Sequence, residues 1–294
     1  MAERVMPPAP RPRPDIVHPV VEPGAAGVAE RRLGLLARLR DNEAARRIFV
    51  VLLLALAWEG YGRWLANDLI FPTLGQTLSA FWDATARGPL LDRILTSLRV
   101  LSLGYAAGIA LAGVFTTIAV TTRFGTDLLS TLTAMFNPLP AIALLPLALL
   151  WFGLGLPSLV FVIVHSVLWA VALNTHTGFL AVPETLRMAG RNVGLRGIAY
   201  VALILVPAAF PSILAGLKIG WAFAWRTLIA AELVFGVSSR SGGLGWYIFE
   251  NRNQLETANV FAGLLAVIGI GLLVESVVFR VVERGTVRRW GMLR

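Results

Sequence analysis

The sequence predicts an all-α polytopic membrane protein with six transmembrane helices, and two observations lead to this fold class. Hydrophobic residues make up 56% of the 294 residues and charged residues 15%, and the mean hydropathy is +0.72. Such a composition is typical of integral membrane proteins rather than soluble domains. In addition, six apolar stretches are long enough to cross a bilayer, which takes roughly 20 residues of helix. They lie near 48–66, 95–120, 127–151, 157–180, 201–234 and 258–281.

The segments that flank these spans differ from them in composition. Residues 1–45 form a predicted cytoplasmic tail, proline-rich at first and then alternating leucine with arginine at helical spacing. The second part of this tail is predicted either as a helix on the cytoplasmic face of the membrane or as a solvated leader. Residues 46–283 form the predicted transmembrane domain, and residues 284–294 form a second tail. Arginines gather in both tails, so the positive-inside rule places both termini in the cytoplasm.

Three prolines make the third span unusual. Pro138, Pro140 and Pro146 lie in an almost wholly apolar stretch, and a proline removes a backbone donor and kinks a helix. The freed backbone groups must find partners on neighbouring helices or in a water-filled cavity. We therefore predict that this helix lines a translocation pathway, the alternative being an ordinary kinked membrane helix. The fifth span is over-long and contains Pro207 and Pro211, so its first turns are expected in the interface.

The connections between spans carry further signals. Residues 73–85 form a predicted amphipathic helix at the outer interface. Residues 183–198 form a predicted cytoplasmic loop that contains a short helix and three arginines. The connection at 236–257 is predicted to lie outside, and its glycines permit close approach of backbones.

Ionisable residues inside spans are costly, and they are therefore candidates for function. Arg226 is predicted either to attract an anion along the pathway or to form an ion pair between subunits. Glu232 lies six residues further along the same span, which is a poor spacing for a salt bridge with Arg226, and it is a second pathway candidate. His165 is interpreted as a packing histidine rather than a ligand.

Several classes of function are excluded or disfavoured. The chain has no cysteine, which excludes thiolate metal sites, and its three scattered histidines suggest no metal site. It has no GxxxxGK[ST] phosphate-binding loop, so it is not itself an ATPase. The net charge of +9 is interpreted as membrane topology and contact with anionic lipid. No nucleic-acid partner is expected, because no basic patch carries interleaved aromatic residues.

The cytoplasmic loop and the span after it contain a spaced motif. The sequence from 188 to 207 resembles E-A-A, three residues, G, nine residues, I-x-L-P, the coupling motif of binding-protein-dependent ATP-binding-cassette importer permeases. Met188 replaces the glutamate and Val206 the leucine, and Glu184, one turn earlier, is a candidate substitute for the glutamate. The resemblance implies contact with an ATPase through a predicted coupling set: Glu184, Arg187, Met188, Ala189, Gly190, Arg191, Gly194, Ile204 and Pro207.

A second stretch points to one branch of these permeases. Residues 138–155 read PLPAIALLPLALLWFGLG, which is similar to the P-x-P, A-L-L-P-L and L-W-F-G-x-G signature of the nitrate, sulfonate and taurine branch. The sequences FPT at 71–73, AAE at 230–232 and GLG at 243–245 fall where that branch has similar residues. The matches run in order from about residue 70 to 282, so the chain is identified as a member of this family.

The resemblance implies a type I ABC importer permease fold in a bacterial inner membrane. It implies that two copies of the chain form the path, that two cytoplasmic ATPase subunits bind ATP and magnesium, and that a periplasmic solute-binding protein delivers the solute. The chain itself would be non-catalytic and would hold no cofactor. The expected solute is a small anion, with an aliphatic sulfonate or taurine ahead of nitrate. The alternative is an ion-gradient-driven secondary transporter, whose internal repeats and coupling carboxylates are not evident.

Overall fold

The computed structural model describes residues 42–234 and 242–290, and all structural statements refer to these ranges. The described residues are helical, with no strand among them. The chain divides into two compact units, residues 1–53 and residues 54–294. The described part of the first unit is the beginning of helix α2 (Glu43–Leu65). Most of the predicted N-terminal tail, including its proline-rich part, lies outside the described residues, as do the last four residues.

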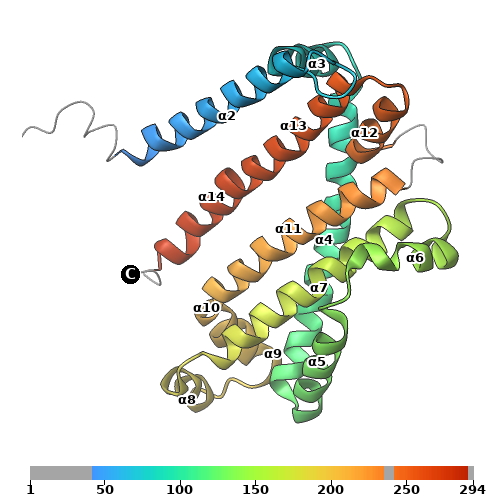
Figure 1. The fold of residues 1–294 in the computed structure, drawn as a ribbon. Helices are drawn as coiled ribbons and strands as arrows, with labels where there is room; N and C mark the ends of the chain where they lie inside the picture. Colours follow the sequence, from blue (N-terminus) through green and yellow to red (C-terminus); the bar gives the residue numbers. More distant parts are fainter. Residues whose placement is uncertain (1–41, 235–241, 291–294) are drawn as a thin grey trace, which may run out of the picture. The chain divides into compact units, whose positions relative to one another are not determined.

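The second unit holds the rest of α2 and all the later helices (Figure 1). In chain order these are α3 (Leu74–Ala86), α4 (Leu90–Thr121), α5 (Arg123–Phe136), η1 (Ala141–Leu144), α6 (Leu145–Phe152), α7 (Leu156–Leu180), α8 (Glu184–Asn192), α9 (Gly197–Tyr200), η2 (Val201–Leu205), α10 (Val206–Ala208), α11 (Phe210–Val234), α12 (Leu244–Asn253), α13 (Thr257–Leu273), η3 (Val274–Phe279), α14 (Arg280–Glu283) and η4 (Arg284–Arg288).

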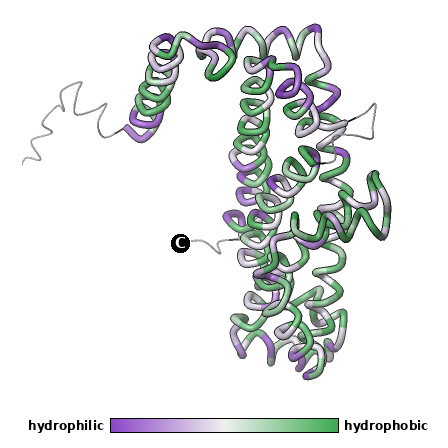
Figure 2. Tube along the Cα trace, turned by 45° about the vertical axis from the view of Figure 1, so that its right-hand side comes forward, coloured by the Kyte–Doolittle hydropathy of each residue, from purple (hydrophilic) through white to green (hydrophobic). Residues whose placement is uncertain are grey.

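Five of the six predicted spans correspond to long apolar helices in the structure. These helices of the described chain are long and apolar enough to cross a membrane: 43–65, 90–121, 156–180, 210–234 and the continuous run 257–288. The remaining predicted span corresponds to α5 and the 141–152 segment, a bent pair of helices that is either one broken span or a re-entrant loop. Figure 2 shows apolar residues running along most of the length of the long helices. The prediction of an all-α polytopic membrane protein is confirmed.

Helix α7 is the centre of the packing, with α4 and α11 lying against it (Figure 1). Small residues make these approaches possible. A Cβ atom built at Gly104 of α4 would lie 2.6 Å from Cγ2 of Ile163, and one at Gly108 would lie 2.7 Å from Cβ of Val167. Gly216 of α11 makes a similar close approach to α7. Membrane helices commonly associate through such small residues, since close backbone contact replaces the hydrophobic driving force that lipid does not supply.

The third span is broken rather than merely kinked. Helix α5 ends at Phe136, and the chain resumes as η1 and α6 after a bend of 88°. Pro138 and Pro140 lie in the four-residue connection, where neither can donate a backbone hydrogen bond. The expectation that Pro146 also kinks the helix is wrong, because this residue lies in the first turn of α6, where a missing N–H has no partner to lose.

The fifth predicted span, 201–234, is divided near its prolines. A short apolar segment runs from 197 to 208, and α11 begins at Phe210 after a turn at Ala209. Pro207 lies in the first turn of α10 and Pro211 in the first turn of α11. The predicted amphipathic helix between the first two spans is present as α3. Its start is fixed by a capping box in which Thr73 accepts from the backbone of Gln76 and Gln76 accepts in return.

Candidate functional site

The loop at 183–198 folds around α8, which lies outside the membrane-length helices. Pro183 precedes the helix, Glu184 lies in its first turn and Arg191 in its last turn. This order of charges complements the helix dipole, which favours acids at the N-terminus and bases at the C-terminus. The helix is only nine residues long, so its stability must come from contacts with the rest of the chain.

Two parts of the spaced motif meet through Gly190. This glycine is buried in α8, and a Cβ atom built on it would lie 2.8 Å from Cγ1 of Ile204 and 3.3 Å from Cε2 of Tyr200. A side chain at this position would therefore push α8 away from the 197–208 segment. The motif spacing brings a small residue and a branched apolar residue, fourteen positions apart, into direct contact.

Arg187 ties α8 to the end of α7. Its Nε donates to the carbonyl oxygen of Val182 at 3.1 Å, and its Nη2 donates to that of Phe179. The last carbonyls of a helix have no partner within the helix, and a basic side chain there also complements the helix dipole. The side chain of Arg187 is only 15% exposed. Arg187 thus holds the loop in place instead of presenting its charge to a partner.

Gly194 ends α8 by its backbone conformation. Its φ is +82°, and a Cβ atom added there would meet no atom within 4 Å. The N–H of Leu195 donates to the carbonyl of Gly190 at 3.1 Å, and the N–H of Gly194 donates to that of Arg191 at 3.0 Å. These two bonds form a Schellman motif, which requires a left-handed residue at this position. The chain itself therefore accounts for the glycine, without reference to a partner.

The remaining side chains of α8 form an exposed surface. We call Glu184, Met188, Arg191 and Val193 the coupling surface; Met188 is 48% exposed and Val193 is 74% exposed. Oε1 of Glu184 lies 3.8 Å from Nη1 of Arg191 across this surface. Ala189 is also exposed, whereas Ile204 is half-buried against Gly190 of the helix, and Pro207 is half-buried in α10. The predicted coupling set thus divides into residues that face outward and residues that hold the loop.

A cavity of about 380 Å³ lies where the broken third span meets α7 and α11. Its walls bring together Pro138, Pro140 and Arg226, three of the five residues predicted to line a pathway. Pro146 and Glu232 do not line it. The other lining residues are Asn137, Leu139, Ala141, Ile142, His165, Ser166, Trp169, Phe223, Thr227 and Ala230.

Arg226 is an exposed residue of α11 that lines this cavity and also a second one, whose lining includes Glu275. Its Nε donates to the carbonyl oxygen of Ala222 at 3.0 Å, and its guanidinium carbon lies 5.1 Å from the ring centroid of Phe223. Across the described ranges, Arg226 forms no ion pair with a carboxylate. The ion pair between subunits and the attraction of an anion both stay open as interpretations of this residue.

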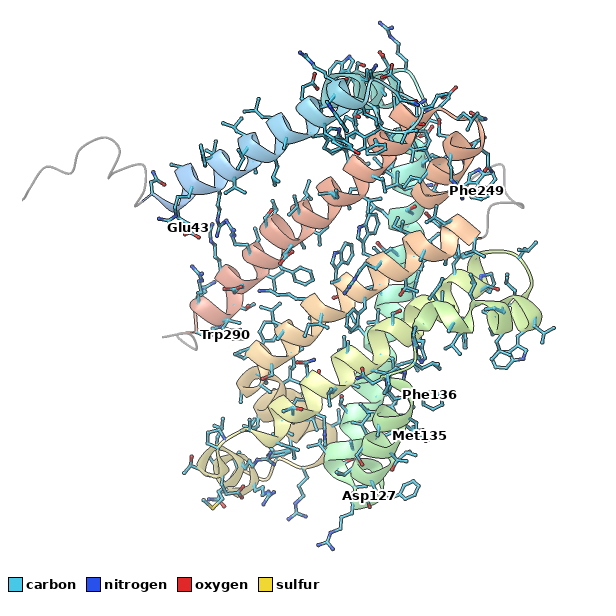
Figure 3. The ribbon with its side chains drawn as sticks, viewed as in Figure 1. Glu43, Asp127, Met135, Phe136, Phe249 and Trp290 are labelled. Carbon is cyan, nitrogen blue, oxygen red and sulfur yellow. The ribbon has the colours of Figure 1, made fainter. Side chains whose placement is uncertain are left out.

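His165 and Trp169 are polar residues of the cavity that the sequence analysis did not assign to it. Both nitrogens of His165 and the indole nitrogen of Trp169 are buried without a hydrogen-bond partner among the described residues. Phe136 lies at the end of α5 (Figure 3). Its ring stacks on Trp169 with ring centroids 5.5 Å apart and meets His165 edge to face. His165 was predicted to be a hydrogen-bonded packing residue: it packs against Phe136 and Trp169, but its nitrogens have no hydrogen-bond partner in the described chain.

Glu232 anchors α12 to the spans. Its side chain is 4% exposed, and both carboxylate oxygens accept a hydrogen bond from the Ser97 hydroxyl at 2.8 Å. It also accepts from the backbone N–H of Gly245, and Ser97 accepts from the N–H of Leu244, both at 2.8 Å. These bonds satisfy two N–H groups of the first turn of α12, which have no partner within the helix.

The G-L-G sequence at 243–245 is explained by this anchor. A Cβ atom built on Gly243 would lie 2.1 Å from Oε1 of Glu232, and one built on Gly245 would lie 2.6 Å from the carbonyl oxygen of Ile229. Only glycine lets the backbone come this close to the carboxylate and to α11. The pathway role predicted for Glu232 stays a prediction, and its contacts in the structure are those of a structural residue.

Metal ligands do not gather in the described ranges, where no group of three His, Cys, Asp or Glu residues could hold an ion. Lys218, the other basic residue of α11, is paired: its Nζ lies 2.8 Å from Oε2 of Glu283 near the end of the last span. Arg226 therefore differs from Lys218 in having no acidic partner within the described chain.

Comparisons with known proteins agree with these features. The profile of the family described as "Binding-protein-dependent transport system inner membrane component" matches residues 104–287. An aliphatic sulfonates transport permease protein of Escherichia coli is 29% identical over 72% of this chain and 79% of the relative. A nitrate import permease protein of Synechocystis is 29% identical over 81% and 85%, respectively. A taurine transport system permease protein of Escherichia coli is 29% identical over 77% and 82%.

Proposed function

The chain belongs to the family of binding-protein-dependent transport system inner membrane components, and we propose that it is the permease subunit of an ATP-driven importer of a small oxyanion. Two copies of the chain form the translocation path. Two cytoplasmic ATPase subunits bind ATP and magnesium, so the chain needs no cofactor of its own. A periplasmic solute-binding protein delivers the solute. Both termini lie on the cytoplasmic side of a bacterial inner membrane, where the arginines of the tails contact anionic lipid.

The observation that carries this proposal is the way the chain holds α8. Gly190 packs against Ile204, and Arg187 caps the carbonyls at the end of α7. A displacement of α8 is therefore transmitted to α7 and to the segment leading into α11. Closure of an ATPase dimer against the coupling surface would move these spans, a rigid-body switch of the kind that drives alternating access.

The coupling surface has a mixed chemistry that suits a protein partner. Met188 and Val193 offer apolar contact, and Glu184 and Arg191 offer charge. The coupling set has Met188 where the family motif has glutamate, so we propose that Glu184, exposed on the same side of α8, supplies the acidic contact. Ala189 is exposed beside these residues, Gly194 ends α8 so that the surface has its shape, and Ile204 supports the helix through Gly190. Pro207 begins the short helix α10 in the segment that leads to α11.

The path is proposed to pass the cavity at the broken third span. Pro138 and Pro140 shape its wall, and Arg226 supplies a positive charge with no acidic partner in the described chain. An anion that enters a membrane protein meets a large desolvation cost, which a positive charge on the path lowers. Relatives named for sulfonate, nitrate and taurine transport support a compact oxyanion as the solute. Pro146 and Glu232 have supporting roles outside this cavity.

Reconstitution tests the class of transporter. The chain and its ATPase are placed in proteoliposomes together with the solute-binding protein. Uptake of labelled taurine, methanesulfonate and nitrate is then measured in three conditions: with ATP inside the vesicles, with ATP outside them, and without ATP. We expect uptake that requires ATP on the ATPase side and also requires the binding protein. Uptake driven by a proton or sodium gradient without ATP would contradict the proposal and indicate a secondary transporter.

A further inference from the structure

Three residues in the wall of the cavity at the broken third span carry hydrogen-bond donors, and two of them, His165 and Trp169, have no hydrogen-bond partner among the described residues. The indole N–H of Trp169 can only donate, and this residue is 7% exposed. A neutral His165 donates through one ring nitrogen and accepts through the other. The guanidinium of Arg226 can only donate, and its Nε already donates to Ala222. A buried donor left unpaired costs free energy, so the cavity is complementary to a ligand that carries several acceptors.

The charges around the cavity have one sign. Arg226 is one of its lining residues, and no Asp or Glu side chain is among them. Much of the remaining wall is apolar, with Leu139, Ile142 and Phe223 contributing side chains. Electrostatic attraction is stronger in such surroundings than in water. A cation is disfavoured here, and a compact anion is favoured.

The donors are fixed in place by contacts on their other sides. Phe136 stacks on Trp169 with an angle of 11° between the rings, and it meets His165 at 82°. Phe223 and the carbonyl of Ala222 hold Arg226. Groups held this way lose little freedom on binding a ligand, and this preorganisation favours affinity.

A hydroxyl pair in the cavity wall is satisfied within the chain. The hydroxyl of Ser166 donates to the carbonyl oxygen of Val162 at 3.2 Å. Since a hydroxyl has one proton, Thr227 then donates to Ser166, whose oxygen lies 2.8 Å away. The donor set offered to a ligand is therefore that of His165, Trp169 and Arg226.

We propose that His165, Trp169 and Arg226 together form an oxyanion-binding site, in which the oxygens of a sulfonate or nitrate group accept hydrogen bonds from all three side chains. This inference rests on the proposed function, which supplies the path and the class of solute, and it adds the groups that bind the solute inside the permease. His165 and Trp169 are then specificity-determining residues, because an uncharged analogue cannot satisfy their donors and the guanidinium together.

The binding site can be observed directly by NMR of the histidine side chains. The chain contains three histidines, at 18, 165 and 176, so ¹⁵N-histidine labelling gives few signals, and His165→Asn identifies the one from the cavity. The labelled full-length chain, assembled with its ATPase in nanodiscs, is titrated with methanesulfonate and separately with nitrate, against chloride at equal ionic strength. We expect the His165 signal to shift and saturate while that of His176, on the same helix but outside the cavity, stays unchanged.

A matched pair of variants tests the indole. Trp169→Phe removes the N–H and keeps an aromatic ring against Phe136, and we expect the apparent affinity for methanesulfonate to fall roughly tenfold, as for a hydrogen bond to a charged group. Trp151→Phe removes an exposed indole of α6 outside the cavity, and we expect the affinity of this variant to equal that of the wild type. Where Trp169→Phe fails to assemble, the wild-type titration alone decides.

The outcomes separate this inference from the function it rests on. A His165 signal that does not respond to either anion, in an assembly that takes up oxyanions with ATP, overturns the site and leaves the transporter intact. A His165 signal that changes when two copies of the chain associate, and not when an anion is added, also overturns the binding site. It would place these donors at the interface between the two copies. An assembly that takes up no oxyanion at all counts against the proposed function instead.

Discussion

Replacing Gly194 distinguishes two explanations of this position. The resemblance to the coupling motif suggests that a glycine here lets the ATPase approach closely, whereas the structure shows a left-handed backbone that ends α8. Alanine at this position meets no atom of the chain within 4 Å, so it adds no clash. Its cost is conformational, about 1–2 kcal/mol for an L-residue in the left-handed region. Asparagine tolerates this region better despite its larger side chain.

The two explanations predict opposite orders for the variants. If the backbone conformation matters, coupling should follow Gly > Asn > Ala > Val. The conformational cost above corresponds to an apparent Kd for the ATPase that Gly194→Ala raises by roughly five- to thirtyfold. If close approach matters, the smaller alanine should be tolerated better than asparagine. The assay is the ATPase activity stimulated by the loaded solute-binding protein, together with co-purification of the subunits. An alanine variant that couples better than the asparagine variant would refute the backbone account.

Three further predictions concern the loop and the α12 anchor. Gly190→Val should uncouple ATP hydrolysis from transport while the chain still inserts into the membrane. The valine side chain would overpack against Ile204, which costs roughly 1–3 kcal/mol. Normal coupled uptake in this variant would contradict the contact between Gly190 and Ile204. Glu232→Ala should destabilise the purified chain by roughly 1–3 kcal/mol, because the N–H of Gly245 is left buried and unpaired. Glu232→Gln keeps an acceptor, so its thermal unfolding temperature should fall less than that of the alanine variant. Met188→Glu should leave assembly intact, since the side chain is half exposed and glutamate restores the family residue; loss of co-purification would show a partner adapted to an apolar contact.

The sequence predicted the membrane fold well because it depends on properties that the sequence displays directly. Apolar length located the five long helices and the bent pair that stands in the place of the third predicted span, and the prolines at 138 and 140 marked the bend. The 88° bend was not predictable, since a proline frees backbone groups without fixing the direction in which the chain leaves. Pro146 shows the limit of the rule that a proline kinks a helix. Its position in the first turn of α6 makes it part of a helix start, and the sequence alone does not give that position.

Part of the candidate site was also predictable. The motif spacing located α8, but the division between outward-facing and holding residues depends on contacts. Arg187 and Arg191 have the same charge and lie on the same helix, yet one caps carbonyls of α7 and the other is exposed. The sequence gives no signal for this difference beyond helical spacing.

Glu232 and His165 show why ionisable residues in spans are hard to assign. Glu232 accepts from the N–H of Gly245, thirteen residues later in the first turn of α12, and the nearest sequence signal for this contact is the G-L-G at 243–245. His165 has no hydrogen-bond partner in the described chain, and this can be recognised only when its neighbours are known. A histidine four residues before a tryptophan on one helix face was the available signal, and it is a weak one.

The claim that α8 is the surface through which an ATPase drives this chain can be tested by site-specific crosslinking. The natural sequence has no cysteine, so Met188→Cys introduces a single thiol on the coupling surface. Leu255→Cys introduces a matched exposed thiol in the connection after α12, which the account places on the opposite side of the membrane. With a short thiol-reactive photo-crosslinker, the account predicts a covalent link from position 188 to the ATPase whose yield changes with ATP, and none from position 255. A link from position 255, or an intact assembly with no link from position 188, would contradict it.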